Sequence, residues 1–146
     1  MIEIDGSCYE THIRIDQNHP TLASACRLIP DFAKINFDLI IRDNNLSTLE
    51  GISPRVGHNL WAARNNLTSL HNIHKHLKYV GISIGFKHNP IKSHVLGLLL
   101  IDGLQKIFLD NKEVEDIINK HLKNGRDIFA CQEELIEAGF DEFANL

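Results

Sequence analysis

The chain has 146 residues, enough for one domain that buries about two-thirds of the surface its unfolded form exposes. Hydrophobic residues make up 43% of the chain and charged residues 23%, which is ordinary for a soluble globular protein. The net charge of −4 argues against sequence-independent binding to nucleic acid, because such binding needs Lys and Arg to displace counterions.

Neither a targeting signal nor a membrane span is expected. Residues 1–5 are acidic and lack the basic region and long apolar core of a secretion signal. The longest apolar stretch without glycine, residues 98–101, is far too short to cross a bilayer. The three cysteines form no C-x-x-C pair, so neither a zinc knuckle nor a redox pair is indicated. We therefore expect one domain spanning residues 1–146, located in the cytoplasm, without a cofactor.

The first segment, residues 1–36, is predicted to form an N-terminal β/α cap. Isoleucines alternate with other residues at positions 2–4 and 13–15, as in short strands. Residues 21–29 fit a short helix that Pro30 ends. A cap is expected because the first unit of a repeat array otherwise leaves its core face open to water.

One pattern recurs within residues 37–115. It reads L-x-L-x-x-N-x-L, with Ala, Phe and Ile substituting for some of the leucines. The copies are residues 39–46, 60–67, 84–91 and 107–114, starting 21, 24 and 23 residues apart. The fourth copy is degraded, because Lys112 stands where the Asn belongs. Spacings of this size are typical of leucine-rich repeats.

The pattern resembles the leucine-rich repeat family, specifically the short, irregular repeats frequent in uncharacterised phage and marine microbial proteins. The resemblance covers about half of the chain. It implies an α/β fold: a short solenoid of about four repeats with a parallel sheet, closed at both ends by caps. The two L-x-L residues of each copy are expected to point inward, and the Asn of each turn to satisfy exposed backbone groups. These structural asparagines are Asn44, Asn65 and Asn89.

The last segment, residues 112–146, is predicted to be a helical C-terminal cap. Apolar residues three to five positions apart indicate an amphipathic helix that ends at Asn124-Gly125. Asp127 is expected to cap a second helix that ends at Gly139. The residues expected to face inward from this second helix are Ile128, Cys131, Leu135 and Ile136.

Residues between the inward positions are expected to line the opposite face of the sheet, which is concave in the family. A column of Ile, Trp and Phe is unusual for a face in contact with water, and Gly85 is expected to leave space within it. Trp and Arg are also enriched at binding hot spots. The candidate binding residues are Ile40, Arg42, Trp61, Arg64, Lys87, His88 and Phe108. They predict a non-enzymatic module that binds an unidentified protein, so Trp61→Asp should abolish binding and leave thermal stability nearly unchanged.

Three alternatives remain open. In the first, the column is covered by the N-terminal segment or by a second copy of the chain, which would make a homodimer. In the second, the chain binds nucleic acid, with Trp61 as a stacking platform among Arg42, Arg64 and Lys87, although its net charge disfavours this partner. In the third, the histidine-rich loop of residues 71–76 binds a metal ion or takes part in catalysis. No Cys or carboxylate in that loop completes a ligand set, so we expect no metal and no enzyme activity.

Overall fold

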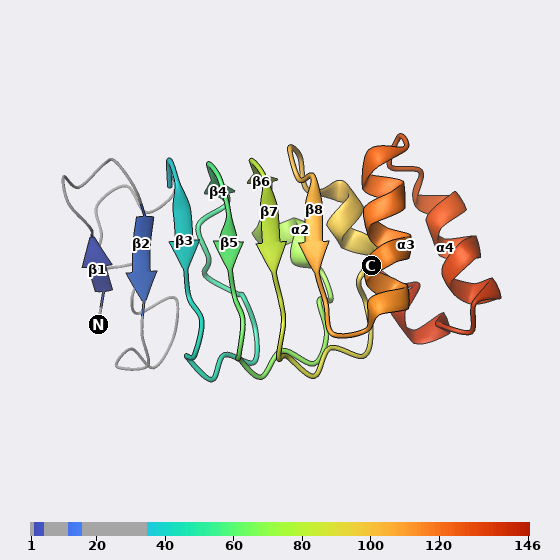
Figure 1. Ribbon diagram of the computed structural model, residues 1–146, viewed down its shortest axis with the longest axis horizontal. Helices are drawn as coiled ribbons and strands as arrows, with labels where there is room; N and C mark the ends of the chain where they lie inside the picture. The colour runs from blue at the N-terminus through green and yellow to red at the C-terminus, as the bar shows by residue number, and fades with distance from the viewer. Residues whose placement is uncertain (1, 5–11, 16–34) are drawn as a thin grey trace.

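The computed structural model describes residues 35–146 and, before them, only the backbone of strands β1 (Ile2–Ile4) and β2 (His12–Ile15). The described residues form a mixed α/β structure with a mostly parallel sheet (Figure 1). This agrees with the predicted class and with the two predicted N-terminal strands. The helix predicted over residues 21–29 lies outside the described residues.

Six strands form the main sheet, in the order β1-β2-β3-β5-β7-β8. Strand β1 is antiparallel to β2, and every other neighbouring pair is parallel. The remaining strands of this sheet are β3 (Asp38–Ile40), β5 (Leu60–Trp61), β7 (Ser83–Gly85) and β8 (Lys106–Phe108). A second parallel sheet consists of β4 (Arg55–Val56) and β6 (Tyr79–Val80).

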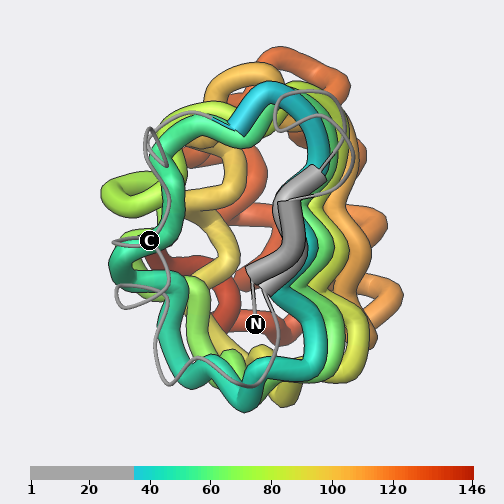
Figure 2. The backbone as a smooth tube through the Cα atoms, turned by 90° about the vertical axis from the view of Figure 1, so that its left-hand side faces the viewer, coloured from blue at the N-terminus to red at the C-terminus, as the bar shows by residue number. Residues whose placement is uncertain are grey.

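Successive segments of the chain follow closely similar paths, as the view along the sheet shows (Figure 2). Equivalent residues of the recurring pattern are direct neighbours across the strands: Leu39 pairs with Leu60, Leu60 with Ile84, and Ile84 with Ile107. The inward positions of the pattern are at most 3% exposed, as predicted. These core residues are Leu39, Ile41, Leu60, Ala62, Ile84, Phe86, Ile107 and Leu109.

Three α-helices occur in the described part of the chain, together with two 3₁₀ helices. They are α2 (Ile73–His76), η1 (Leu96–Leu100), α3 (Lys112–Lys123), α4 (Ile128–Glu137) and η2 (Asp141–Phe143). None of these helices is long and apolar enough to cross a bilayer. Helix α3 follows β8 at the end of the sheet, and α4 lies beyond α3 (Figure 1). After η2 the chain returns to the segment before η1, where the N–H of Val95 donates to the Phe143 carbonyl at 3.1 Å.

Both long helices are capped at their N-termini by a side chain, and the sequence pattern predicts one of these two caps. The Asp127 carboxylate accepts a hydrogen bond from the Ala130 N–H at 3.0 Å, which caps α4 as predicted. At α3 the cap is Asn111, whose side chain accepts from the Val114 N–H at 3.1 Å. Helix α3 therefore begins at Lys112, where the fourth copy of the pattern lacks its Asn, and replaces the turn of the other copies.

The prediction that Ile136 faces inward is wrong. Leu135 and Cys131 are fully buried, and they fix the rotation of α4 about its axis. Ile136 follows Leu135 by about 100° around the helix, so it falls on the outer side and is 50% exposed. Two adjacent apolar residues on a helix cannot both point at the centre of the buried face.

An asparagine ladder made of Asn44, Asn65 and Asn89 holds the turns that follow the strands. Asn65 is its middle rung. Its Oδ1 accepts from the Asn44 N–H at 2.9 Å and from the Leu46 N–H at 3.1 Å, both in the preceding copy. Its Nδ2 donates to the carbonyls of Ile41 and Ala62, each at 3.0 Å. One buried amide thus connects two copies of the pattern.

The third rung repeats this geometry. Asn89 Oδ1 accepts from the Leu67 N–H at 3.1 Å, and its Nδ2 donates to the carbonyls of Ala62 and Phe86 at 2.9 and 3.0 Å. The residue before each rung has a positive φ, between 55° and 61°: Asp43, Arg64 and His88. The backbone therefore makes the same left-handed step at each copy, and this step aims the amide at the neighbouring copy.

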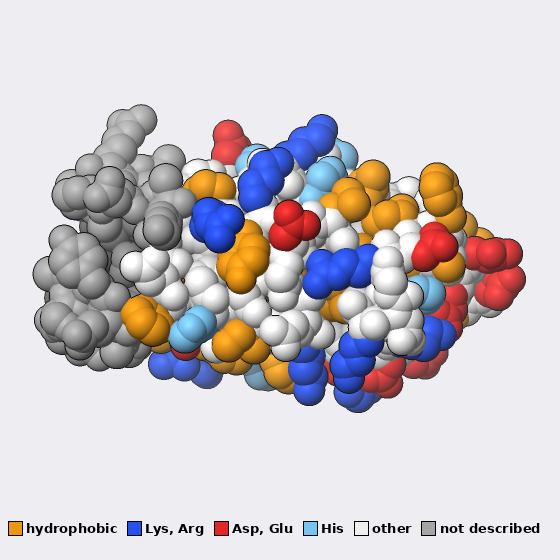
Figure 3. Space-filling model, turned by 90° about the horizontal axis from the view of Figure 1, so that it is seen from above, with side chains coloured by type: hydrophobic (Ala, Val, Ile, Leu, Met, Phe, Trp, Pro, Cys, Tyr) orange, Lys and Arg blue, Asp and Glu red, His pale blue; other side chains and the backbone are white. Residues whose placement is uncertain are grey.

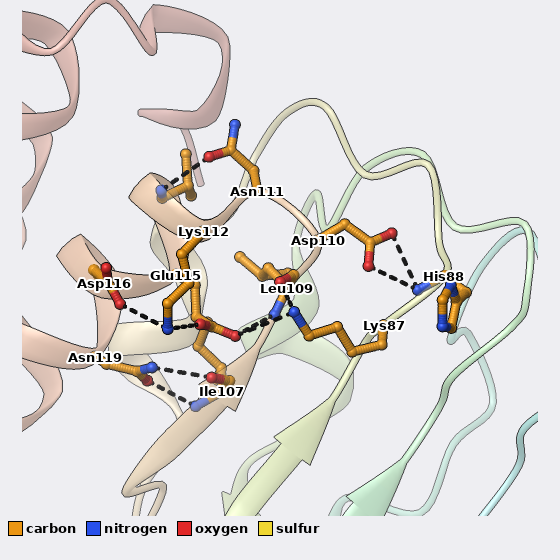
Figure 4. Close-up of polar contacts among 11 residues, drawn as sticks. Lys87, His88, Ile107, Leu109, Asp110, Asn111, Lys112, Glu115, Asp116 and Asn119 are labelled. Atoms are coloured by element: carbon orange, nitrogen blue, oxygen red, sulfur yellow. Dashed lines mark hydrogen bonds and ion pairs between the residues drawn. The ribbon is translucent and has the colours of Figure 1, made fainter.

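Helix α3 closes the last edge of the sheet with side chains (Figure 4). Asn119 accepts from the Ile107 N–H at 2.8 Å and donates to the Ile107 carbonyl at 3.0 Å. Glu115 Oε1 accepts from the Leu109 N–H at 2.9 Å. These side chains take the place of another strand, so the edge offers fewer free groups for pairing with a further chain.

Candidate functional site

The predicted column of outward residues is brought together by the strand register. Ile40 pairs with Trp61, Trp61 with Gly85, and Gly85 with Phe108. We call this column and its flanking polar residues the outer sheet face. The side chains of Ile40, Trp61 and Phe108 are all partly exposed, whereas their strand neighbours Leu39, Leu60 and Ile107 are buried in the core.

Trp61 is held flat against this face. Its Nε1 donates to Asp38 Oδ2 at 3.3 Å, and its ring centroid lies 6.3 Å from that of Phe108. A Cβ added at Gly85 would lie 2.7 Å from Trp61 Cε3, so the indole rests directly on the backbone of Gly85. The expectation that Gly85 leaves open space is therefore wrong, because the indole fills it. The missing side chain is what allows Trp61 to lie across the next strand.

A polar row on the same face was missed in the sequence analysis. The Asp38 carboxylate accepts from the Asn59 backbone N–H at 2.9 Å and from the Asn59 side chain at 3.0 Å. Ser83 Oγ in turn donates to Asn59 Oδ1 at 2.6 Å. These three residues precede Ile40, Trp61 and Gly85 by two positions, so the strand period of two places both sets on one face. The same period therefore could have identified them.

The predicted basic residues differ in their availability. Arg42 is exposed and has no carboxylate within ion-pair distance among the described residues. Arg64 Nε lies 3.3 Å from Asp43 Oδ1, a pair in which both side chains are more than half exposed. Such a surface pair is worth at most about 1 kcal/mol and breaks easily for a partner.

Lys87 is engaged at the border between the sheet and α3 (Figure 4). Its Nζ donates to the Leu109 carbonyl at 2.6 Å and lies 3.8 Å from Glu115 Oε1. Glu115 is only 3% exposed, and burial by itself would raise its pKa. Hydrogen bonds from Lys112 and from the Leu109 N–H outweigh burial and hold the pKa of Glu115 below its ordinary value. The carboxylate therefore stays ionised at neutral pH.

The outer sheet face also carries a cation that the sequence analysis did not single out. Lys106 Nζ lies 4.9 Å from the centroid of the Phe108 ring, within the range of a cation–π contact. His88, in contrast, stands at the turn after β7, where its backbone N–H donates to both carboxylate oxygens of Asp110 at 3.1 Å. Its place is therefore at the end of the face, away from Trp61.

The histidine-rich loop brings together no set of metal ligands with other described residues. No group of three or more His, Cys, Asp or Glu side chains in the described ranges is arranged to hold an ion. Burial lowers the pKa of His74, and the positive charges of Lys75 and Lys78 lower it further. The cavity beside the loop, lined in part by His71 and His76, measures about 30 Å³, room for a few water molecules at most.

Cys131 is unsuited to act as a nucleophile. Its side chain is fully buried in α4, and it is a free thiol. Burial raises its pKa to about 12, so the reactive thiolate is scarce at neutral pH. The thiol contributes to core packing.

Comparison of the chain with models of known protein families, with curated proteins and with solved structures finds no match. The resemblance to leucine-rich repeats thus rests on the recurring pattern of this sequence, and membership of that family stays a prediction.

Proposed function

We propose that the chain is a solenoid of four leucine-rich-repeat-like units whose outer sheet face binds a protein partner without catalysing a reaction. The in-register parallel strands, the asparagine ladder and the period of 21 to 24 residues support the solenoid. Each unit contributes one strand to the outer sheet face, and the partly exposed side chains of Ile40, Trp61 and Phe108 on these strands are the surface that we expect a partner to contact.

The observation that carries the proposal is the fixed position of Trp61. A tryptophan that binds a partner usually loses side-chain freedom on binding, and this loss weakens the complex. Here the indole is already held by Asp38 on one side and by the backbone of Gly85 beneath it. Its remaining surface is pre-organised for contact, next to the ring of Phe108.

The charges around Trp61 favour a protein with an acidic rim over a nucleic acid. Arg42 is exposed and has no carboxylate within ion-pair distance among the described residues, Arg64 would first have to leave its weak pair with Asp43, and Lys87 donates to the Leu109 carbonyl. A nucleic-acid site would need several such cations at once to displace counterions from phosphates. An aromatic centre bordered by Arg42 is closer to the composition of a protein-binding hot spot.

The experiment is capture of partners from native cell lysate at physiological salt, with mass spectrometry of what is retained. The baits are the wild type, Trp61→Ser, Arg42→Glu and Leu100→Ser. Leu100 is 44% exposed and lies in η1, outside the main sheet, so its substitution is the matched control. We expect one protein to be retained by the wild type and Leu100→Ser and to be lost from the other two.

Folding of each bait is checked by thermal unfolding. Trp61→Ser removes packing on Gly85 and Phe108, so a lowered melting temperature is expected, in contrast to the unchanged stability that the sequence analysis predicts for Trp61→Asp. Arg42→Glu alters only an exposed side chain and should melt like the wild type. Retention of the same proteins by all four folded baits would contradict the proposal.

A further inference from the structure

Helix α4 carries two large apolar side chains that no described residue covers. Phe129 is 80% exposed and Ile136 is 50% exposed. They are seven residues apart, which places them two helical turns and about 10 Å from each other on one side of the helix. The opposite side is fixed by the fully buried Cys131 and Leu135, so α4 cannot rotate to bury them.

Acidic side chains surround this apolar pair. Glu133 lies between Phe129 and Ile136 along the helix, and Glu137 follows one turn later. Both are exposed, and among the described residues neither forms an ion pair. Residues 141 and 142, just after the helix, add two more exposed carboxylates.

The acidity is a property of this end of the molecule. Residues 112–146 contain nine Asp and Glu against four Lys and Arg, whereas residues 35–111 contain five against eight. Figure 3 shows the result: acidic side chains gather at the helical end, while Lys and Arg side chains run along the middle. A partner at the helical end therefore meets a negative potential.

A second copy of this chain is a poor occupant of the face. Symmetric packing of two α4 helices through Phe129 and Ile136 would bring the two Glu133 carboxylates together at the centre of the contact. Like charges brought together and partly desolvated oppose association. Two apolar side chains on one helix also offer far less area than a stable dimer interface needs, but they suit a single helix of a partner.

We propose that the outer face of α4 docks a basic amphipathic helix of another protein. The apolar side chains of that helix pack on Phe129 and Ile136, and its Lys or Arg residues lie beside Glu133 and Glu137. This site is distinct from the outer sheet face, since α4 packs beyond α3 at the end of the molecule (Figure 1).

The probe is a labelled synthetic helix of about 15 residues, built from Leu and Lys at amphipathic spacing and titrated by fluorescence anisotropy. A peptide of identical composition, rearranged so that it has no apolar face, is the matched probe. We expect the amphipathic peptide to bind the wild type and Phe129→Ser/Ile136→Ser to bind it about tenfold more weakly or worse. The control variant Ile82→Ser/Leu100→Ser removes two other exposed apolar side chains and should bind like the wild type.

A second variant tests the acidic rim. Glu133→Gln/Glu137→Gln should weaken binding at low salt and make binding less dependent on salt. The variant lacks two carboxylates whose attraction to the Lys residues of the peptide is screened by salt in the wild type. Both pairs of substitutions are at exposed positions, so thermal unfolding should remain close to that of the wild type.

Two results would overturn the proposal. If the rearranged peptide binds as well as the amphipathic one, the attraction is electrostatic alone and the apolar pair has no part in it. If Phe129→Ser/Ile136→Ser binds the amphipathic peptide like the wild type, the face is elsewhere. Self-association of the wild type that the same two substitutions abolish would assign the face to a second copy and reject the basic helix.

Discussion

The sheet region and the helical end of this molecule satisfy their backbones in different ways. In the sheet region a strand and its turn depend on the next copy, because the Asn65 amide bonds backbone groups of two copies. Helices α3 and α4 satisfy most of their backbone groups internally. The first three copies therefore keep Asn at the same place, whereas the outer side of a helix is free to vary.

The difference explains where periodicity ends. At the last strand the partner changes from another strand to a helix, and two α3 side chains, Glu115 and Asn119, replace the ladder of backbone bonds. Residues beyond this junction form helices, which need only a stripe of apolar residues on the side that packs against the core. On the outer side of α4, Phe129 and Ile136 are exposed and need not match any such pattern.

The largest effect is expected from Asn65→Ala, which breaks the middle rung of the asparagine ladder. The substitution removes the acceptor of two buried N–H groups, whereas the Ile41 and Ala62 carbonyls keep the side-chain amides of Asn44 and Asn89 as donors. The cost should be about 3 kcal/mol or more, since each unsatisfied buried group costs about 1–3 kcal/mol. Denaturant unfolding measures it. The matched control is Asn66→Ala: Asn66 is exposed, and within the described ranges its side chain donates to Asn45 alone, at 2.5 Å. Equal losses in the two variants would remove the distinction between ladder and surface asparagines.

A smaller, pH-dependent effect is expected at the junction. The pKa of Glu115 is lowered in the folded protein, so protonation favours the unfolded state. Its contribution is complete above the ordinary pKa of Glu and is lost as the pH falls through the lowered value. Glu115→Gln should cost about 1 kcal/mol at neutral pH and flatten the loss of stability in acid. Glu134, whose pKa is lowered by Lys120 and then by His121, gives the wild type part of the same acid sensitivity.

The measurement is the free energy of unfolding of the wild type and of Glu115→Gln at a series of pH values between neutral and pH 3. Parallel curves would mean that α3 does not hold the strand edge through this carboxylate.

A change in stability of about 1 kcal/mol, no larger than that of Glu115→Gln at neutral pH, is expected from Gly85→Ala. The new methyl group would lie 2.7 Å from Trp61 Cε3, so the indole has to move away from the sheet. Because Trp61 is the only tryptophan, its fluorescence should shift to the red as the ring becomes more exposed. An unchanged emission spectrum would show that the ring is not held against Gly85.

Much of the fold follows from the sequence because the sheet region is periodic. The pattern around Leu39, Leu60 and Ile84 identifies the inward residues without knowledge of distant contacts. The sequence pattern does not predict which neighbouring strand a side chain contacts. Trp61 reaches across to Gly85 and back to Asp38, and neither contact can be read from the pattern. The inward orientation predicted for Ile136 in α4 is wrong because its neighbour Leu135 is equally apolar, and the sequence does not show which of the two faces the core.

The measurement that tests the central claim most directly is the affinity of the captured partner for three purified proteins: wild type, Trp61→Ser and Leu100→Ser. Calorimetric titration at physiological salt should give a dissociation constant for Trp61→Ser at least about tenfold above that of the wild type. The constant for Leu100→Ser should be unchanged. Equal affinities for all three would contradict a binding role for the outer sheet face.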